Sequence, residues 1–283
     1  MALQLTKYFA RAVLEKEEVA SLFYHDIFDY PLTEGELIRW RGGKKLVVAS
    51  SHLKVRYRRG FYYLGAKAGV IFKRLLRQRI SAQKLKIARK AGKILSFIPS
   101  IKMVAVTGAL AMRSAQEGAD VDLLLVTQKG MLWTSRLLTL LVLSVIGFPL
   151  RKFGAKNQKD KLCLNLWLDE SKLAWPKKDR NAYTAHEIAQ IVPLVNKDKT
   201  YEKFMTQNAW LKDYWPNAVG RLKVPKEKKR GKGGLLSRFF ERMAFQIQYL
   251  YMRKKITREK ISAKYALFHP HNWGKVVMER LTS

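Results

Sequence analysis

The central part of the chain alternates short apolar runs with stretches of helical pattern. Three runs have the apolar or alternating character of buried β-strands: residues 101–106, 121–127 and 161–168. Residues 109–115 and 131–148 lie between these runs and have helix-forming composition. We therefore expect residues 99–220 to form an α+β domain in which helices flank a β-sheet.

The first 65 residues combine helical patterns with a predicted hairpin. Pro31 disfavours a helical conformation at Tyr30, and Thr33 followed by Glu36 has the capping-box spacing that begins a new helix. A tight turn is predicted to join two strands, at residues 54–57 and 61–64. Helices followed by a hairpin favour a winged-helix-like domain over residues 1–65. The alternative is a helical cap with a hairpin that makes no contact with nucleic acid.

Two basic segments connect and follow these domains. Residues 66–98 have an apolar side and many bases, so they predict a basic connecting helix. Residues 221–283 predict a basic helical C-terminal region, because residues 236–255 are amphipathic and rich in aromatic side chains.

The distribution of charge narrows the choice of partners. The chain has 55 Lys and Arg against 22 Asp and Glu, a formal net charge of +33. Residues 37–116 contain 20 bases and no acid, and residues 221–260 contain 14 bases and three acids. Residues 117–220 are nearly balanced. Two basic regions around a balanced domain favour a polyanionic partner: a nucleoside triphosphate, DNA or RNA, or an anionic membrane surface.

Cysteine content and hydrophobicity indicate the compartment. Cys163 has no second cysteine with which to form an internal disulfide. The longest predominantly apolar run, residues 137–150, is shorter than the roughly 20 residues of a membrane-spanning helix and predicts a buried core helix. The first residues lack the continuous apolar core of a secretory signal. We expect a cytoplasmic protein without a transmembrane segment.

The residues best suited to chemistry surround the second predicted strand. Asp120 and Asp122 are two residues apart on that strand, so their carboxylates point the same way and can share a hard cation such as Mg²⁺. Thr107, Gly108 and Ala109 follow the first predicted strand, where a glycine lets backbone approach a phosphate at the start of a helix. Together they predict a site for a nucleoside triphosphate and its metal.

These two motifs resemble the signature of the nucleotidyltransferase fold of the DNA polymerase β superfamily, which is Gly-Ser, a short gap, Asp-x-Asp, and a third acid on a later strand. Thr107-Gly108-Ala109 and Asp120-Val121-Asp122 match its position and spacing. The chain is also similar, over about residues 10–220, to bacterial proteins assigned only to this domain. The resemblance implies a mixed β-sheet with flanking helices and two Mg²⁺ ions. It also implies transfer of a nucleoside monophosphate from a triphosphate to a hydroxyl that the third acid helps to activate.

Two positions depart from that signature. Ala109 stands where the family has Ser, and Asn165 stands on the third predicted strand where an acid is expected. An amide can offer its oxygen to a cation, but it cannot act as a general base near neutral pH. The alternative function is therefore a catalytically degenerate protein of this fold that binds nucleic acid or regulates another activity.

Other basic residues are candidates for phosphate contacts. Arg136 lies one turn into the helix after the second predicted strand, where it either reaches a triphosphate or forms a salt bridge at the edge of the core. Arg56, Arg58 and Arg59 lie on the predicted hairpin beside aromatic residues and suit sequence-independent phosphate binding. A third alternative is peripheral membrane attachment through residues 221–260.

Overall fold

The computed structural model describes residues 14–48, 54–67, 69–152, 157–220, 234–253, 260–268 and 273–282. The helices are α1 (Lys16–Asp26), α2 (Glu34–Arg39), α3 (Val70–Leu95), α4 (Gly108–Ala111), α5 (Leu132–Val145), α6 (Ala182–Ala189), α7 (Thr200–Gln207), α8 (Leu235–Arg253) and α9 (Trp273–Thr282). The strands are β1 (Leu32–Thr33), β2 (Val55–Arg58), β3 (Phe61–Leu64), β4 (Ile101–Val106), β5 (Val121–Thr127), β6 (Leu162–Asp169), β7 (Val192–Asn196), β8 (Lys260–Ser262) and β9 (Tyr265–Leu267). Short 3₁₀ helices cover Lys177–Asp179 and Ala209–Asp213.

Six strands form one mixed sheet in the order β7-β4-β5-β6-β9-β8. β5 and β6 are parallel, and every other neighbouring pair is antiparallel. The three strands predicted from the apolar runs are β4, β5 and β6 at the centre of this sheet. The prediction of an α+β fold with a mixed sheet and flanking helices is confirmed. The edge strands β7 and β8 were not predicted, and neither was β9.

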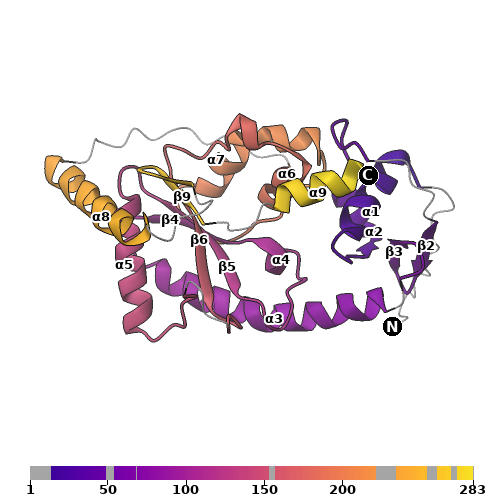
Figure 1. Cartoon of the computed structure of the whole chain (residues 1–283), viewed down its shortest axis with the longest axis horizontal. Helices are drawn as coiled ribbons and strands as arrows, with labels where there is room; N and C mark the ends of the chain where they lie inside the picture. The colour runs from indigo at the N-terminus through magenta and orange to yellow at the C-terminus, as the bar shows by residue number, and fades with distance from the viewer. Residues whose placement is uncertain are drawn as a thin grey trace, which may run out of the picture.

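Each face of the sheet carries its own hydrophobic cluster, because successive side chains of a strand point to opposite faces. One cluster includes Met103, Ala105, Leu124, Val126, Leu166 and Leu168, together with side chains of α1, α2, α6, α9 and the segment after α7. The other includes Val104, Val106, Leu123, Leu125 and Trp167, together with side chains of α3, α5 and α8. The sheet is therefore the middle layer of three (Figure 1).

Two predicted helices differ from the structure. The helix predicted over residues 109–115 is only the four-residue α4, since Arg113 adopts a positive φ of 54° that ends the helical geometry. The apolar run at residues 137–150 was predicted to be a buried core helix, and this is wrong for one side of α5. Leu141 and Val145 are 59% and 77% exposed, because α5 packs on one face of the sheet and has no described layer outside it. Within the described part of the chain, no helix is long and apolar enough to cross a bilayer.

The N-terminal segment follows the order α1-β1-α2-β2-β3, and its strands form a small antiparallel sheet ordered β1-β3-β2. Thr33 and Glu36 form the predicted capping box at the start of α2. The predicted hairpin is present, and its turn residues Arg59 and Gly60 both have positive φ, which matches the twist of the strands they join. Residues 45–48 are not helical, and residues 49–53 lie outside the described ranges.

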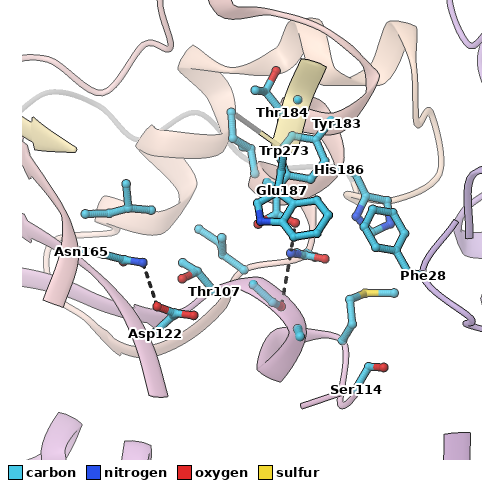
Figure 2. Close-up of a pocket in the computed structure, with 18 of the residues that line it drawn as sticks. Phe28, Thr107, Ser114, Asp122, Asn165, Tyr183, Thr184, His186, Glu187 and Trp273 are labelled. Atoms are coloured by element: carbon cyan, nitrogen blue, oxygen red, sulfur yellow. Dashed lines mark hydrogen bonds between the residues drawn. The ribbon is translucent and has the colours of Figure 1, made fainter. Parts of the chain in front are cut away.

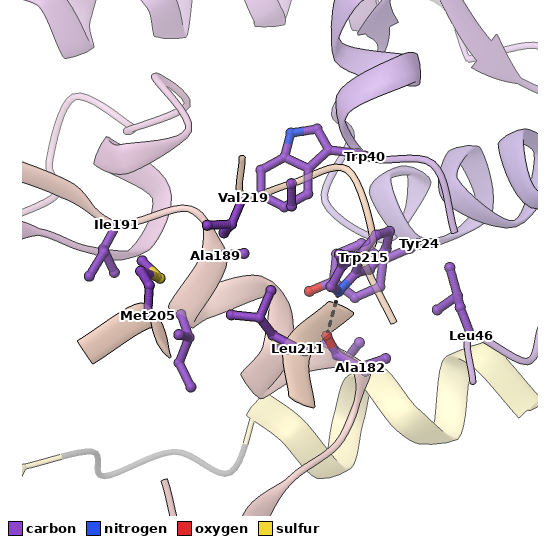
Figure 3. Close-up of a cluster of buried hydrophobic side chains, with 14 of the residues drawn as sticks. Tyr24, Trp40, Leu46, Ala182, Ala189, Ile191, Met205, Leu211, Trp215 and Val219 are labelled. Carbon is purple, nitrogen blue, oxygen red and sulfur yellow. Dashed lines mark hydrogen bonds between the residues drawn. The ribbon is translucent and has the colours of Figure 1, made fainter. Parts of the chain in front are cut away.

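The N-terminal segment shares its core with the rest of the chain. Trp40, the residue after α2, stacks on His186 of α6 with ring centroids 4.0 Å apart. His25 of α1 also contacts the His186 ring, and the Nε2 atoms of the two histidines are 3.2 Å apart. Trp215, which is fully buried, packs edge-on against this group and donates its indole N–H to the Ala182 carbonyl (Figure 3). Helices α1 and α2 are therefore fixed relative to the face of the large sheet that carries α6.

Part of the basic character of α3 has a structural use. Arg74 is 2% exposed; it donates to the Glu36 carboxylate, to the Tyr30 hydroxyl and to the Arg113 carbonyl. Lys84 is also buried and donates to the carbonyls of residues 117 and 119 and to the carboxylate of Asp160. These two bases hold the loop between α4 and β5, and this loop leads directly to Asp120.

Candidate functional site

A cavity of about 1380 Å³ lies between the N-terminal segment and one face of the large sheet. Its lining comes from α1, the loop before α4, β5, β6, α6 and α9 (Figure 2). Aromatic side chains form much of the wall: Phe28, Trp175, Tyr183, Phe268 and Trp273. Basic side chains also line it: Arg77, Arg151, Lys178, Lys260, Lys275 and Arg280. The cavity thus offers flat apolar surfaces and positive charge, which suit a ligand with a ring system and phosphates.

Asp122 and Asn165 meet on the floor of this cavity. They lie on the neighbouring parallel strands β5 and β6, and the Asn165 Nδ2 donates to the Asp122 Oδ1 at 2.8 Å (Figure 2). Asp120 is two residues earlier on the same side of the chain, and ligand atoms of Asp120, Asp122 and Cys163 all lie within 4.8 Å of one another. The structure therefore brings together the predicted metal ligands Asp120 and Asp122, and it adds Cys163. It also places Asn165, the residue at the predicted third position, against Asp122.

The amide oxygen of Asn165 has no hydrogen-bond donor although the side chain is buried. Burying such an oxygen without a partner is unfavourable by roughly 1–3 kcal/mol. If the amide turned over so that its oxygen faced Asp122 in place of Nδ2, a cation shared with the neighbouring carboxylates would give this oxygen a partner. Two carboxylates and an amide oxygen are the donor types that hard divalent ions prefer, so these residues fit Mg²⁺.

Arg151 lies over the carboxylate pair. Its Nη1 is 2.9 Å from the Asp120 Oδ2 and 3.3 Å from the Cys163 Sγ. The Arg151 side chain is 38% exposed, whereas that of Asp120 is 16% exposed. Arg151 therefore connects the acidic floor to the open part of the cavity, where its remaining N–H groups can face an anionic ligand.

Gly108 brings the backbone close to the same carboxylates. It adopts a φ of 60°, a conformation that favours glycine, and a Cβ added there would lie 3.4 Å from the Asp122 Oδ2. The Thr107 N–H donates to the Asp122 carbonyl at 3.1 Å. The helix that follows has only four residues, so the predicted contribution of a helix N-terminus to phosphate binding is lost and only local backbone N–H groups remain.

Burial shifts the ionisation of the acidic floor. It raises the pKa of Asp122 to about 7, and the nearby Asp120 carboxylate adds to this effect while Cys163 and Arg151 oppose it. Burial, followed by the two carboxylates, also raises the pKa of the Cys163 thiol. Cys163 is therefore a neutral thiol near pH 7, and its Sγ is a poor ligand for a hard cation.

Sequence reasoning missed an acidic group on the opposite wall. Glu187 of α6 accepts a hydrogen bond from the Gln190 Nε2 at 2.7 Å, and the same nitrogen donates to the Gly108 carbonyl at 3.3 Å. Burial raises the pKa of Glu187 to about 7, with a smaller effect from Asp122. One side chain, Gln190, thus links Glu187 to the turn beside Asp122. A lone Glu on a short helix carries no motif, so only the tertiary structure shows it.

The remaining predicted residues lie elsewhere. Arg136 is not among the residues that line the cavity; its guanidinium donates to Gln248 of α8 at 2.5 Å and lies over the ring of Phe268. Burial lowers the pKa of Arg136 to about 10, so it remains charged at neutral pH. Arg56, Arg58 and Arg59 are exposed on the hairpin at the end of the molecule away from α8 (Figure 1).

Comparisons of the chain with protein-family models, with curated proteins and with solved structures found no match in any of the three. The chemistry of this site is therefore inferred from its own residues and geometry.

Proposed function

We propose that the protein binds a nucleoside triphosphate together with Mg²⁺ in this cavity and transfers its nucleoside monophosphate to a hydroxyl. The observation that carries the proposal is the meeting of Asp120, Asp122 and Asn165 beside the Gly108 turn, with an amide oxygen that lacks a partner. The mixed sheet and the spacing of these residues are also those that the resemblance to nucleotidyltransferases implies. Thr107, Gly108 and Ala109 would face the phosphates.

Each residue has a distinct task in this proposal. The carboxylates of Asp120 and Asp122 and the Asn165 amide oxygen would hold Mg²⁺, which neutralises charge on the phosphates as the bond to the leaving pyrophosphate breaks. Arg151 keeps the two carboxylates apart from bulk solvent and presents N–H donors to the phosphates. The aromatic walls exclude water and bind the nucleobase or the acceptor by their flat faces.

Glu187 compensates for the missing third acid. A carboxyl with a pKa of about 7 is partly ionised at neutral pH and can accept a proton. In the proposed step the acceptor oxygen bonds to the α-phosphorus, its proton moves to the Glu187 carboxylate, and pyrophosphate leaves with the electrons of the broken bond. Glu187 lies on the wall opposite the metal ligands, so the acceptor would lie between them (Figure 2).

Calorimetric titration of the purified chain with ATP, CTP, GTP and UTP tests the proposal. We expect at least one triphosphate to bind with Mg²⁺ and to lose most of its affinity in EDTA, because the phosphates and the carboxylates require a shared cation. Glu187→Gln should keep this affinity, since Glu187 contacts the acceptor. A failure of all four triphosphates with Mg²⁺ or Mn²⁺ would exclude the proposed enzyme. Tighter binding with Zn²⁺ that Cys163→Ser abolishes would assign the metal site to another ion.

A second function is favoured by the hairpin. Arg56, Arg58 and Arg59 are exposed on one short segment that has no acid, which is the charge pattern of a phosphate-binding wing. In this second proposal the chain is a nucleic-acid-binding module built on a degenerate nucleotidyltransferase-like domain.

Replacing the three hairpin arginines by Gln should weaken binding of a 20-nucleotide DNA or RNA at least tenfold at low salt. The salt dependence of binding should also become shallower, because fewer counterions are released. Fluorescence anisotropy over a salt series provides the measurement, and the exposed residues Arg79, Lys86 and Arg89 of α3 changed to Gln provide a control of equal charge. Equal losses in the two triple variants would show diffuse electrostatic binding without a role for the hairpin.

A further inference from the structure

Helix α8 buries polar as well as apolar side chains, and it exposes many apolar ones. The side turned toward α5 includes Glu241, Ala244 and Gln248, spaced three and four residues apart. Glu241 accepts hydrogen bonds from the backbone N–H groups of Trp133 and Thr134, at 2.7 and 2.9 Å, and thus caps the N-terminus of α5. Gln248 donates to the Trp133 carbonyl at 2.8 Å and accepts from Arg136. Polar contacts therefore fix α8 in place.

The opposite side of α8 is a continuous apolar stripe in solvent. Its members recur at intervals of three and four residues, the spacing of one helix face: Leu236, Phe240, Met243, Ile247 and Leu250. Phe240 is 60% exposed and Ile247 is 59% exposed. A folded protein rarely exposes such a stripe unless another surface covers it.

Helix α5 extends the apolar surface. It packs against α8 at the end of the molecule farthest from the hairpin (Figure 1). Leu137, Leu141 and Val145 recur every four residues along it, and all three are at least half exposed. The apolar surface is thus made by two adjacent helices.

The charge around this surface has one sign. Arg238, Arg242 and Arg253 are exposed on α8, on the side of the helix next to the apolar stripe. The only acid in the sequence of either helix is Glu241, and it is turned inward to cap α5. Residues 221–233, which precede α8, contain seven Lys or Arg and one Glu in their sequence. A second copy of the chain on this face would bring like charges together, whereas an anionic bilayer would neutralise them.

We propose that α8, with the exposed side of α5, binds the surface of a bilayer that contains anionic phospholipid. The apolar stripe enters the boundary between headgroups and acyl chains, and the flanking arginines contact lipid phosphates. Binding of this kind needs both components, because basic residues alone give only a weak and salt-sensitive attachment. The nucleotide site opens elsewhere on the molecule, so this surface does not depend on the function proposed above.

Sedimentation of the full-length chain with sucrose-loaded vesicles tests the proposal. Vesicles of phosphatidylcholine alone and of phosphatidylcholine with 30% phosphatidylserine are compared, and we expect binding mainly to the second. Phe240→Gln/Ile247→Gln leaves the net charge unchanged and should weaken partitioning at least about tenfold, since two side chains lose their transfer into the bilayer. The matched control is Phe72→Gln/Phe97→Gln, which removes two phenylalanines that are 71% and 78% exposed outside this surface.

A second measurement reports insertion directly. In an Ile247→Cys variant, with Cys163 changed to Ser, an environment-sensitive dye at position 247 should shift its emission to the blue on anionic vesicles; the same dye at position 72 should not. Equal loss of binding in both double-Gln variants, or an unshifted dye at 247, would overturn the proposal. It would also be overturned if the wild-type chain were a dimer in solution that Phe240→Gln/Ile247→Gln converts to a monomer, because the occupant would then be a second copy.

Discussion

Asp122→Asn is expected to abolish Mg²⁺-dependent triphosphate binding and at the same time to make the metal-free protein more stable at pH 8. The loss of binding follows because Asp122 is the carboxylate that both Asp120 and Asn165 approach. The gain in stability follows because burial and Asp120 disfavour the charged form of Asp122 in the folded state. A neutral side chain of the same shape removes that unfavourable charge.

The size of the gain can be bounded. Raising the pKa of a carboxyl from 3.8 to about 7 on folding corresponds to roughly 4 kcal/mol of lost stability once the group is ionised in both states. The folded state binds the Asp122 proton more tightly than the unfolded state does. The stability that this proton contributes is therefore full below pH 3.8 and is lost as the pH rises through about 7. We expect a few kcal/mol at pH 8, measured by urea unfolding in EDTA.

Asp169 supplies a matched control for this experiment. It is also a buried Asp near the end of a central strand, but it accepts hydrogen bonds from the Gly130 N–H and from the N–H and hydroxyl of Ser171. Asp169→Asn should therefore lower stability and leave triphosphate binding unchanged. If Asp122→Asn instead lowers stability, or if it binds Mg²⁺-triphosphate as the wild type does, the assignment of Asp122 as the metal ligand is wrong.

The sequence predicted the acidic floor of the site because its geometry is local. A separation of two residues in extended chain places the side chains of Asp120 and Asp122 on the same side, independently of the rest of the fold. Asn165 meets Asp122 because β5 and β6 pair in parallel, and this pairing was not predicted from the sequence. Glu187 was missed because its place in the site depends on how α6 packs across the sheet, and no local pattern encodes that packing.

Charge and hydrophobicity were less informative than spacing. The long acid-free stretch predicted a surface for polyanions, yet Arg74 and Lys84 within it are buried and bind carbonyls and carboxylates of the same chain. The apolar run of residues 137–150 predicted a buried helix, because sequence hydrophobicity alone cannot distinguish a helix that is covered on all sides from one that exposes a face. Both examples concern what lies next to an element in space.

The buried histidine pair gives the second large prediction. His25 Nδ1 lies 2.8 Å from the Ser21 carbonyl, which can only accept, so Nδ1 carries the proton and Nε2 is free to accept from His186. A proton added to His25 Nε2 would place two N–H groups face to face at 3.2 Å. Burial lowers the pKa of His25 to about 4, although Ser21 and Glu36 oppose it and Arg74 adds to it. Burial, and His25 itself, lower the pKa of His186 well below its ordinary value.

Each histidine therefore makes the fold sensitive to acid. His25 binds a proton near pH 6.5 in the unfolded chain and only near pH 4 in the folded chain. Its contribution to stability is therefore full above pH 6.5 and falls as the pH is lowered toward 4. For His25 the loss is about 3 kcal/mol by pH 4. Asp122 and Glu187 act in the opposite direction over the same interval, because their pKa values are raised to about 7. The stability of the wild-type protein should consequently change little between pH 7 and 4.5.

Removing the Asp122 and Glu187 carboxylates should reveal the pH dependence of stability that the two histidines cause. In Asp122→Asn/Glu187→Gln we expect stability to fall steeply from pH 6.5 to 4.5, by up to about 1.4 kcal/mol per pH unit for each histidine. Adding His186→Gln to this double variant should reduce the slope of unfolding free energy against pH by the equivalent of about one bound proton. This change in slope does not depend on how the substitution affects stability at pH 8. Urea unfolding at pH 8, 6.5, 5.5 and 4.5 measures these slopes. Identical slopes in the double and triple variants would mean that His186 is protonated in the folded protein, which contradicts the lowered pKa on which this prediction rests.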